Sequence, residues 1–308
     1  MNNSCFAVVA AAILTVGLGA PVSTWQGQDA GKPQVVSPLG KSHFARPDAD
    51  GAIAKADQAL AADPGNVDLM IAAGRARDNQ WQYNEAIAIY TRVIERAPND
   101  VRGYRLRGHR YISTRRFDRA IADLEKAFAL APSSFDVTYH LALAHYLTGG
   151  FDRAAAVYRG CLDTRKPAGP LPEGWRDCSS VGADDESRTA ITDWLYRALR
   201  RAGRHGEARQ LLGTVADGLP IKENEAYYRA LLFYRGLRTE DQVLDAAAFA
   251  TNTGVTTGYG VGNYYLVEGQ TDRACAVFRR LVEAEQWNGF GFIAAETELT
   301  RSGGPCRR

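Results

Sequence analysis

The stretch GHRYISTRRFDRAIADLEKAFALAP, residues 108–132, carries the pattern that decides the fold. It contains a small residue, then an aromatic residue, then an alanine, and it ends in a proline. The same kinds of residue recur 34 positions upstream and downstream. The recurring positions are Gly74, Gly108 and Ala142; Tyr83, Phe117 and Phe151; Ala86, Ala120 and Ala154; Tyr90, Leu124 and Tyr158; and Pro64, Pro98 and Pro132. A period of 34 residues is typical of a helix-turn-helix repeat.

Each recurring position has a physical role in packed helical hairpins. The small residues let neighbouring helices approach closely, and the aromatic residues fill the space between them. Proline closes each repeat because it cannot continue a helix interior. The pattern predicts a lone helix at 50–62 and then three helix pairs. These pairs are 66–79 with 83–96, 101–113 with 117–130, and 135–147 with 151–163.

On these residues the chain resembles the tetratricopeptide repeat family, closely over 50–165 and with gaps over 188–301. The resemblance implies an all-α fold, an α-solenoid of helix-turn-helix repeats with a C-terminal capping helix. The closing stretch WNGFGFIAAETEL, residues 287–299, is also similar to the end of exported bacterial repeat proteins of unassigned activity. That second likeness bears on location and architecture only.

The rest of the chain divides around these repeats. Residues 21–49 contain four prolines and no apolar period, which predicts a flexible segment, solvated or draped on the array. Residues 166–187 interrupt the period as a loop insertion, and residues 302–308 form a tail. Between them, 188–301 hold weaker pairs and a last helix that covers the end. The predicted helices are 188–201 with 205–216, 223–235 with 239–249, where Asp241 replaces the packed alanine, 259–268 with 272–285, and 290–301.

The N-terminus predicts export. Residues 5–20 are an apolar run without a charge, long enough for the core of a signal peptide and short for a membrane-spanning helix. The absence of Lys and Arg before this run leaves a retained N-terminal anchor as the alternative. We therefore expect a periplasmic or secreted protein of the bacterial cell envelope, which contacts the membrane only if residues 1–20 are retained.

The cysteines agree with export. Cleavage after residue 20 removes Cys5 and leaves an even number, which an oxidising compartment would join in two disulfides. The order along the helices favours Cys161 with Cys178 and Cys275 with Cys306. The first bond would pin the insertion, and its loop of about 18 residues is worth roughly 3 kcal/mol in the chain-entropy model. Four free thiols are the alternative.

Motifs for chemistry are missing from the sequence. The 37 basic and 35 acidic residues nearly balance, which does not favour nucleic-acid binding. His140 and His145 are five apart and do not share a helix face as in a zinc-binding HExxH motif. The glycines of GYGVGN, residues 258–263, fit helix packing better than a phosphate loop. We expect no catalytic residue, no metal and no cofactor, and therefore no enzyme.

A binding role remains. First helices line the concave face of such arrays, where partners lie as extended peptides or helices. Counting from the packed small residues places a basic and aromatic strip on that face. The strip comprises Arg75, Arg102, Arg105, His109, Tyr139, Tyr146, Arg197, Arg200 and Arg201. Arginine forks suit carboxylates, so the expected partner is an envelope protein or peptide, acidic or carboxylate-terminated. In the alternative interpretation these arginines are ordinary solvated charges.

The sequence thus predicts an exported scaffold for protein–protein interaction. The alternative is an enzyme, or the helical subunit of one, that acts on envelope polymers. A pocket with converging carboxylates near 166–187 would favour the enzyme, and a smooth uninterrupted groove would favour the scaffold.

Overall fold

The computed structural model describes residues 31–167, 169–182, 184–244 and 248–307. The apolar run predicted to be a signal peptide or an anchor, residues 1–20, lies outside these ranges. Within them, helices form almost all of the regular structure, and no helix has both the length and the apolar character that crossing a membrane requires. The all-α expectation is confirmed.

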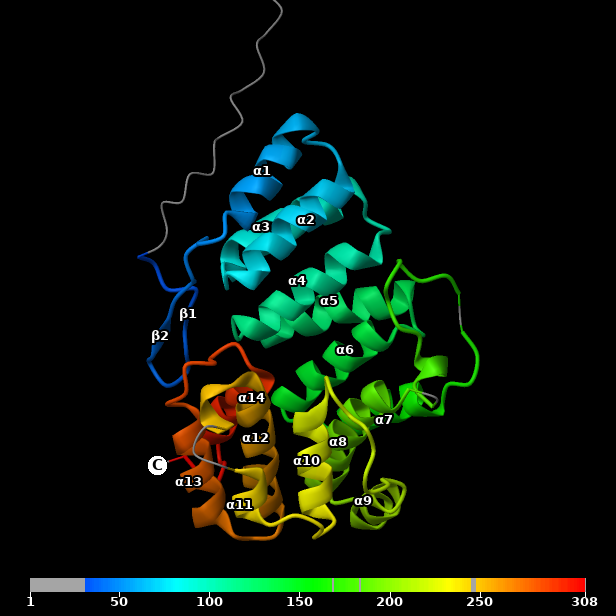
Figure 1. Cartoon of the computed structure of the whole chain (residues 1–308), viewed down its shortest axis with the longest axis vertical. Helices are drawn as coiled ribbons and strands as arrows, with labels where there is room; N and C mark the ends of the chain where they lie inside the picture. The colour runs from blue at the N-terminus through cyan, green and yellow to red at the C-terminus, as the bar shows by residue number, and fades with distance from the viewer. Residues whose placement is uncertain (1–30, 168, 183, 245–247, 308) are drawn as a thin grey trace, which may run out of the picture.

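The first half of the chain is a regular stack of antiparallel helices (Figure 1). The predicted ranges 83–96, 101–113, 117–130, 135–147 and 151–163 match the helices residue for residue. Asparagine, aspartate and serine side chains cap the first helices of the pairs by accepting hydrogen bonds from backbone N–H groups of the first turn. The helices are α1 (Ala52–Ala62), α2 (Val67–Asn79), α3 (Tyr83–Arg96), α4 (Val101–Ser113), α5 (Phe117–Leu130), α6 (Phe135–Leu147) and α7 (Phe151–Asp163).

The small residues of the period lie where helices touch. A Cβ atom added at Gly74 would come 2.4 Å from the ring of Tyr90, and one at Gly108 would come 2.7 Å from Cγ of Leu124. Ala120 is fully buried on the facing helix. The period therefore records close helix approach, as the sequence predicts.

Overpacking this contact should destabilise the protein. We expect Gly108→Leu or Ala120→Leu to lower the free energy of unfolding by about 1–3 kcal/mol, because Leu124 and its neighbours must move. Gly160→Leu is the control, since its added Cβ would meet nothing within 4 Å. Denaturant unfolding that gives equal stabilities for Gly108→Leu and Gly160→Leu would contradict this packing.

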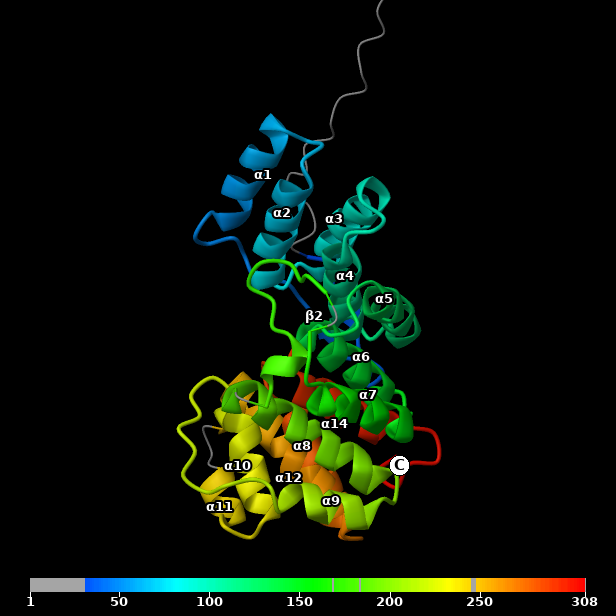
Figure 2. The ribbon, with the colours of Figure 1, turned by 90° about the vertical axis from the view of Figure 1, so that its right-hand side faces the viewer.

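The second half departs further from the period. Asp184 caps α8 and starts it three residues before the predicted 188, and α9 ends at Leu212 instead of residue 216. Figure 2 shows these helices stacked below the first array. The elements are η1 (Cys178–Ser180), α8 (Asp185–Arg201), α9 (His205–Leu212), α10 (Glu225–Tyr234), α11 (Glu240–Val243), η2 (Ala248–Ala250), α12 (Asn252–Val267), α13 (Thr271–Leu281) and α14 (Phe290–Thr300).

Two predicted helices of this half are wrong in extent. Of the helix expected at 239–249, the described residues show the single turn α11 and the start of η2, with Leu244 outside both and Asp241 exposed where a packed alanine would lie. Conversely, α12 begins at Asn252, seven residues before the predicted start, because the side chain of Thr251 caps it by accepting from the backbone N–H of Gly254. GYGVGN therefore lies inside α12, and its three glycines, at positions 258, 260 and 262, all pack against other helices.

Residues 31–49 are draped on the array. They form an antiparallel ladder of β1 (Val35–Val36) and β2 (Ser42–His43). Gln34 accepts a hydrogen bond from the backbone N–H of Asn84, and the Arg46 guanidinium lies 3.5 Å from the centre of the Trp81 ring. Lys41 forms an ion pair with Glu283, so this segment joins the two ends of the stack.

The last helix also closes the inner side of the stack. Helix α14 packs on α12 and α13, as a capping helix should, and it reaches α6 (Figure 1). Its residues Phe292, Ile293, Ala294 and Ala295 are fully buried. The array therefore curves back on itself, and α14 fills part of its concave face.

Candidate functional site

The concave face is filled in its C-terminal part. Tyr139, Tyr146 and Arg197, predicted to line an open groove, are buried in the core, and that prediction is wrong. The Tyr139 hydroxyl lies 2.7 Å from the Tyr227 hydroxyl on α10, and the Tyr146 hydroxyl lies 2.8 Å from the Tyr259 hydroxyl on α12. The cause is tertiary: α10 and α12 pack onto the faces of α6 and α8 that a straight array would leave open.

Three further arginines of the predicted strip are held by carboxylates of the chain itself. Arg200 pairs with Glu268 at 2.7 Å, and Arg201 pairs with Glu298 of α14 at 2.7 Å. Arg102 bridges Asp100 and Asp68, at 2.6 and 2.7 Å. These side chains stabilise contacts within the chain, so their guanidinium groups are not freely available to a binding partner.

The remaining predicted residues lie on α2 and α4. Arg75 is exposed, and no hydrogen bond or ion pair of its side chain occurs within the described residues. Arg105 pairs with Asp136 at 3.0 Å, and its guanidinium lies 5.7 Å from the centre of the Trp175 ring in the insertion. The ring of His109 lies 4.3 Å from that of His140 between ring centres, with the two planes tilted by 47°. The part of the strip that faces outward is thus the N-terminal part.

The segment 286–292 covers the middle of the concave face, a feature that the sequence analysis missed. The Phe290 ring lies 5.3 Å from His109 and 5.7 Å from His140, measured between ring centres. The backbone oxygen of Trp287 accepts a hydrogen bond from Arg115, and Asn288 donates one to the Tyr83 hydroxyl. The aromatic composition of the segment was visible, but nothing in the sequence showed which repeats it would reach.

The histidine pair under this segment should make stability depend on pH. Burial, together with nearby Arg105 and Arg110, holds the pKa of His140 well below its usual value. The unfolded chain protonates this histidine below about pH 6.5 and the folded chain does not, so stability falls as the pH drops through that range. Between pH 7.5 and 5.5 we expect His140→Gln to lose about 1 kcal/mol less than the native protein.

Denaturant unfolding at both pH values checks this expectation. His205→Gln, which changes an exposed histidine away from this cluster, is the control. Identical pH dependence in the native protein and in His140→Gln would refute it.

Among the described residues no group of three or more His, Cys, Asp or Glu side chains is placed to hold a metal ion.

Both predicted cysteine pairs lie at bonding distance. The Cα atoms of Cys161 and Cys178 are 4.9 Å apart, and those of Cys275 and Cys306 are 5.3 Å apart, within the usual range for disulfides. The first pair fastens the insertion to the end of α7. Backbone hydrogen bonds from Phe135 N–H to the Arg176 oxygen and from Cys178 N–H to the Ser133 oxygen hold the same segment.

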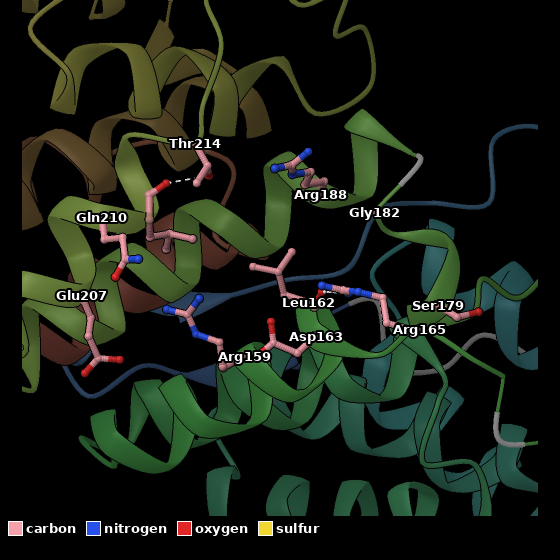
Figure 3. A pocket seen from close by; sticks show the side chains of 11 residues that line it. Arg159, Leu162, Asp163, Arg165, Ser179, Gly182, Arg188, Glu207, Gln210 and Thr214 are labelled. Atoms are coloured by element: carbon pink, nitrogen blue, oxygen red, sulfur yellow. Dashed lines mark hydrogen bonds between the residues drawn. The ribbon is translucent and has the colours of Figure 1, made fainter.

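A cavity of about 560 Å³ opens where this insertion meets α7, α8 and α9 (Figure 3). Its floor includes Leu162 and Leu211, and its walls carry three arginines, Arg159, Arg165 and Arg188. The full lining is Arg159, Leu162, Asp163, Arg165, Ser179, Gly182, Arg188, Glu207, Gln210, Leu211 and Thr214. We call this cavity the arginine pocket.

The arginine pocket lacks the pair of carboxylates that an enzyme of the alternative class would need. Glu207 is bound through both oxygens to Arg204 at 2.7 Å, and its carboxylate points away from that of Asp163 (Figure 3). Ser179 and Thr214 are hydroxyl side chains without a histidine in the lining. With three arginines against two carboxylates, the lining of the pocket carries a net positive charge.

The comparisons with known proteins agree with the fold. Sequence models described as tetratricopeptide repeat match residues 43–109 and 105–170. The small glutamine-rich tetratricopeptide repeat-containing protein 2 of Saccharomyces cerevisiae is 31% identical over 156 residues, 50% of this chain and 42% of that protein. This chain therefore spans less than half the length of that relative.

Two solved structures are similar in fold alone. The MamA protein is 21% identical, with a TM-score of 0.43 over 53% of this chain and 79% of that chain. YrrB, described as a TPR protein with an unusual peptide-binding site, is 12% identical, with a TM-score of 0.45 over 76% of this chain and 94% of that chain.

Stacked hairpins, the packed small residues and the buried aromatic residues define the class, an α-solenoid of helix-turn-helix repeats. Together with the matches over 43–109 and 105–170, they show that residues 43–170 are tetratricopeptide repeats.

Proposed function

We propose that this protein is an exported scaffold of the cell envelope that binds a segment of another protein without changing it covalently. The partner contacts the first helices of the N-terminal repeats, α2 and α4, and it carries acidic side chains or a free C-terminal carboxylate. The observation that carries the proposal is the exposed, unpaired Arg75 on a tetratricopeptide array whose other concave residues are already engaged within the chain.

Two features support the location. The apolar run of residues 5–20 has the length and position of a signal-peptide core, as in exported proteins. The two cysteine pairs lie at bonding distance, and disulfides persist in oxidising compartments. Both features support a location outside the cytoplasm.

The charges on α2 and α4 support the choice of partner. Arg75 and Arg105 both lie close enough to Asp78 to act on its charge, and Arg105 forms its ion pair with Asp136 at the next repeat. A partner carboxylate can use the donors of Arg75 without displacing any contact inside the protein. Arginine presents a planar fork that holds a carboxylate through two hydrogen bonds.

The test is crosslinking in the native envelope followed by identification of the captured neighbour. We expect Arg75→Glu to abolish capture, because the substitution places a negative charge against an acidic segment. Arg75→Glu with Arg105→Glu serves as a stronger variant. Arg197 is unsuitable for reversal, since it is fully buried and would leave an unpaired charge in the core.

Arg92→Glu on the outer helix α3 is the matched control, because it makes the same charge change at an exposed position away from α2 and α4. All variants are first compared by circular dichroism for helix content. If Arg75→Glu captures the same neighbours as Arg92→Glu, this surface does not bind the partner.

A further inference from the structure

We propose that the arginine pocket is a second binding site, and that it takes a carboxylate-bearing extended segment of a protein partner. The inference rests on the proposed function for one point, that the ligand belongs to a protein. It concerns a different site, because the pocket is lined by α7, α8, α9 and the insertion and by no residue of α2 or α4.

The first argument is unused hydrogen-bond donors. Nearly every inward-facing arginine of this chain is paired, as with Arg77 and Asp57 or Arg107 and Asp123. Around the pocket the guanidinium groups of Arg159 and Arg188 have no hydrogen bond or ion pair with any described residue, although both side chains are only half-exposed.

The third arginine of the pocket is partly used. Arg165 donates from one terminal nitrogen to the backbone oxygens of Leu162 and Thr164, at 2.7 and 3.2 Å. These bonds hold its side chain near the cavity while leaving its other nitrogens unused. The pocket therefore has two guanidinium groups without a hydrogen bond to a described residue and a third with unused donors.

The second argument is the shape of the cavity. Its volume, about 560 Å³, falls in the range of ligand sites, roughly 300–1,000 Å³. Leu162 and the buried Leu211 supply an apolar floor beneath the arginines. A ligand that alternates carboxylates with short apolar side chains matches this arrangement, because an extended chain turns successive side chains to opposite sides.

The third argument is the rigidity of the wall. Ser179 and Gly182 belong to the insertion, which the Cys161–Cys178 pair ties to α7 beside Leu162. Asp177 accepts hydrogen bonds from Ser133 and from the backbone N–H of Ser179, so the wall is also tied to the start of α6. A wall that is already ordered loses little conformational freedom when a ligand binds.

The acidic residues of the lining supply a sharper test. Glu207 is neutralised by Arg204, but Asp163 has no hydrogen bond or ion pair of its side chain within the described residues. Asp163 therefore opposes an anionic ligand. Its replacement by asparagine should strengthen binding, which a purely structural role of the pocket would not explain.

The experiment uses the purified exported protein and a fluorescein-labelled hexapeptide of alternating Asp and Leu, followed by fluorescence anisotropy. We expect Arg159→Gln with Arg188→Gln to weaken binding roughly tenfold or more, since two charge-assisted hydrogen bonds are lost. Asp163→Asn should tighten binding by about two- to fivefold, the scale of one exposed charge interaction. Arg209→Gln, an exposed charge on α9 outside the lining, should change nothing.

Three outcomes would overturn the inference. The first is equal affinity for a hexapeptide with Asn in place of Asp. The second is loss of affinity in Arg209→Gln as large as in the double variant. The third is binding of phosphatidylglycerol vesicles without binding of the peptide, which would indicate a membrane surface.

The two proposals fail separately. Arg75→Glu leaves the pocket intact, and the double variant at Arg159 and Arg188 leaves α2 and α4 intact. If substitutions in the pocket leave the affinity for the peptide unchanged while Arg75→Glu still abolishes capture of the envelope partner, only the second site is refuted.

Discussion

Asp193→Ala is expected to lower the free energy of unfolding by about 3–5 kcal/mol at pH 7.5, the typical cost of leaving one charge of a buried ion pair alone. Asp193 and Arg197 face each other one turn apart on α8, both with no exposed surface. Nε of Arg197 donates to Oδ1 of Asp193 at 3.1 Å, and the ion pair brings Nη2 within 2.5 Å of Oδ2. Burial raises the pKa of Asp193 to about 6 despite the nearby arginine, so the pair is charged at this pH. Denaturant unfolding measures the loss.

Two further variants distinguish this cause from a simple cavity. Asp193→Leu combined with Arg197→Met replaces the pair by apolar side chains and should cost less than Asp193→Ala, because no charge stays buried and unpaired. Glu125→Ala removes the exposed pair with Arg153 and should cost less than about 1 kcal/mol. If the double apolar variant is the least stable of the three, the buried charge is not the cause.

Gly291→Ala should be nearly as damaging, at about 3 kcal/mol or more. A Cβ atom at Gly291 would lie 2.1 Å from the backbone oxygen of Val255 and 2.8 Å from Cα of Thr256. Backbone cannot rotate away as a side chain can, so α14 would have to separate from α12. Because α14 also closes the inner side of the array, the concave face around Phe290 should loosen as well.

Gly206→Ala on α9 is the matched control, since its added Cβ would meet nothing within 4 Å. It should leave stability unchanged or raise it by up to about 1 kcal/mol, the usual gain for alanine over glycine in a helix. Thermal unfolding and hydrogen exchange of α14 follow both variants. Equal melting temperatures would show that α12 and α14 do not approach as closely as described.

The outward-facing part of the candidate site was partly predictable from sequence. Counting from the packed small residues placed Arg75, Arg105 and His109 on first helices, because helix period decides which face a side chain takes. Of these, Arg75 is exposed, whereas Arg105 is paired with Asp136 and His109 lies against Phe290. The same count placed Arg197 and Tyr146 on the same strip, yet both are buried. The helical period predicts the face on which a side chain lies, but it does not predict which distant helix covers that face.

The arginine pocket was beyond the reach of sequence. Its lining comes from α7, α8, α9 and an insertion without a period, and the partners of an arginine are set by elements far away in the chain. Arg201 illustrates this dependence: its carboxylate, Glu298, lies 97 positions further on. An unpaired arginine and a paired one look alike in sequence.

The recurring small, aromatic and proline residues determined the hairpins, their bounds over 83–163 and the contacts between neighbouring helices, since these depend on residues within one or two repeats. Tertiary structure decided how strongly the stack curves. That curvature brings α14 against α6 and buries Tyr146 under α12, and it leaves Arg75 on α2 and the arginine pocket open. Curvature accumulates from small rotations at every interface, and no local pattern of residues encodes their sum.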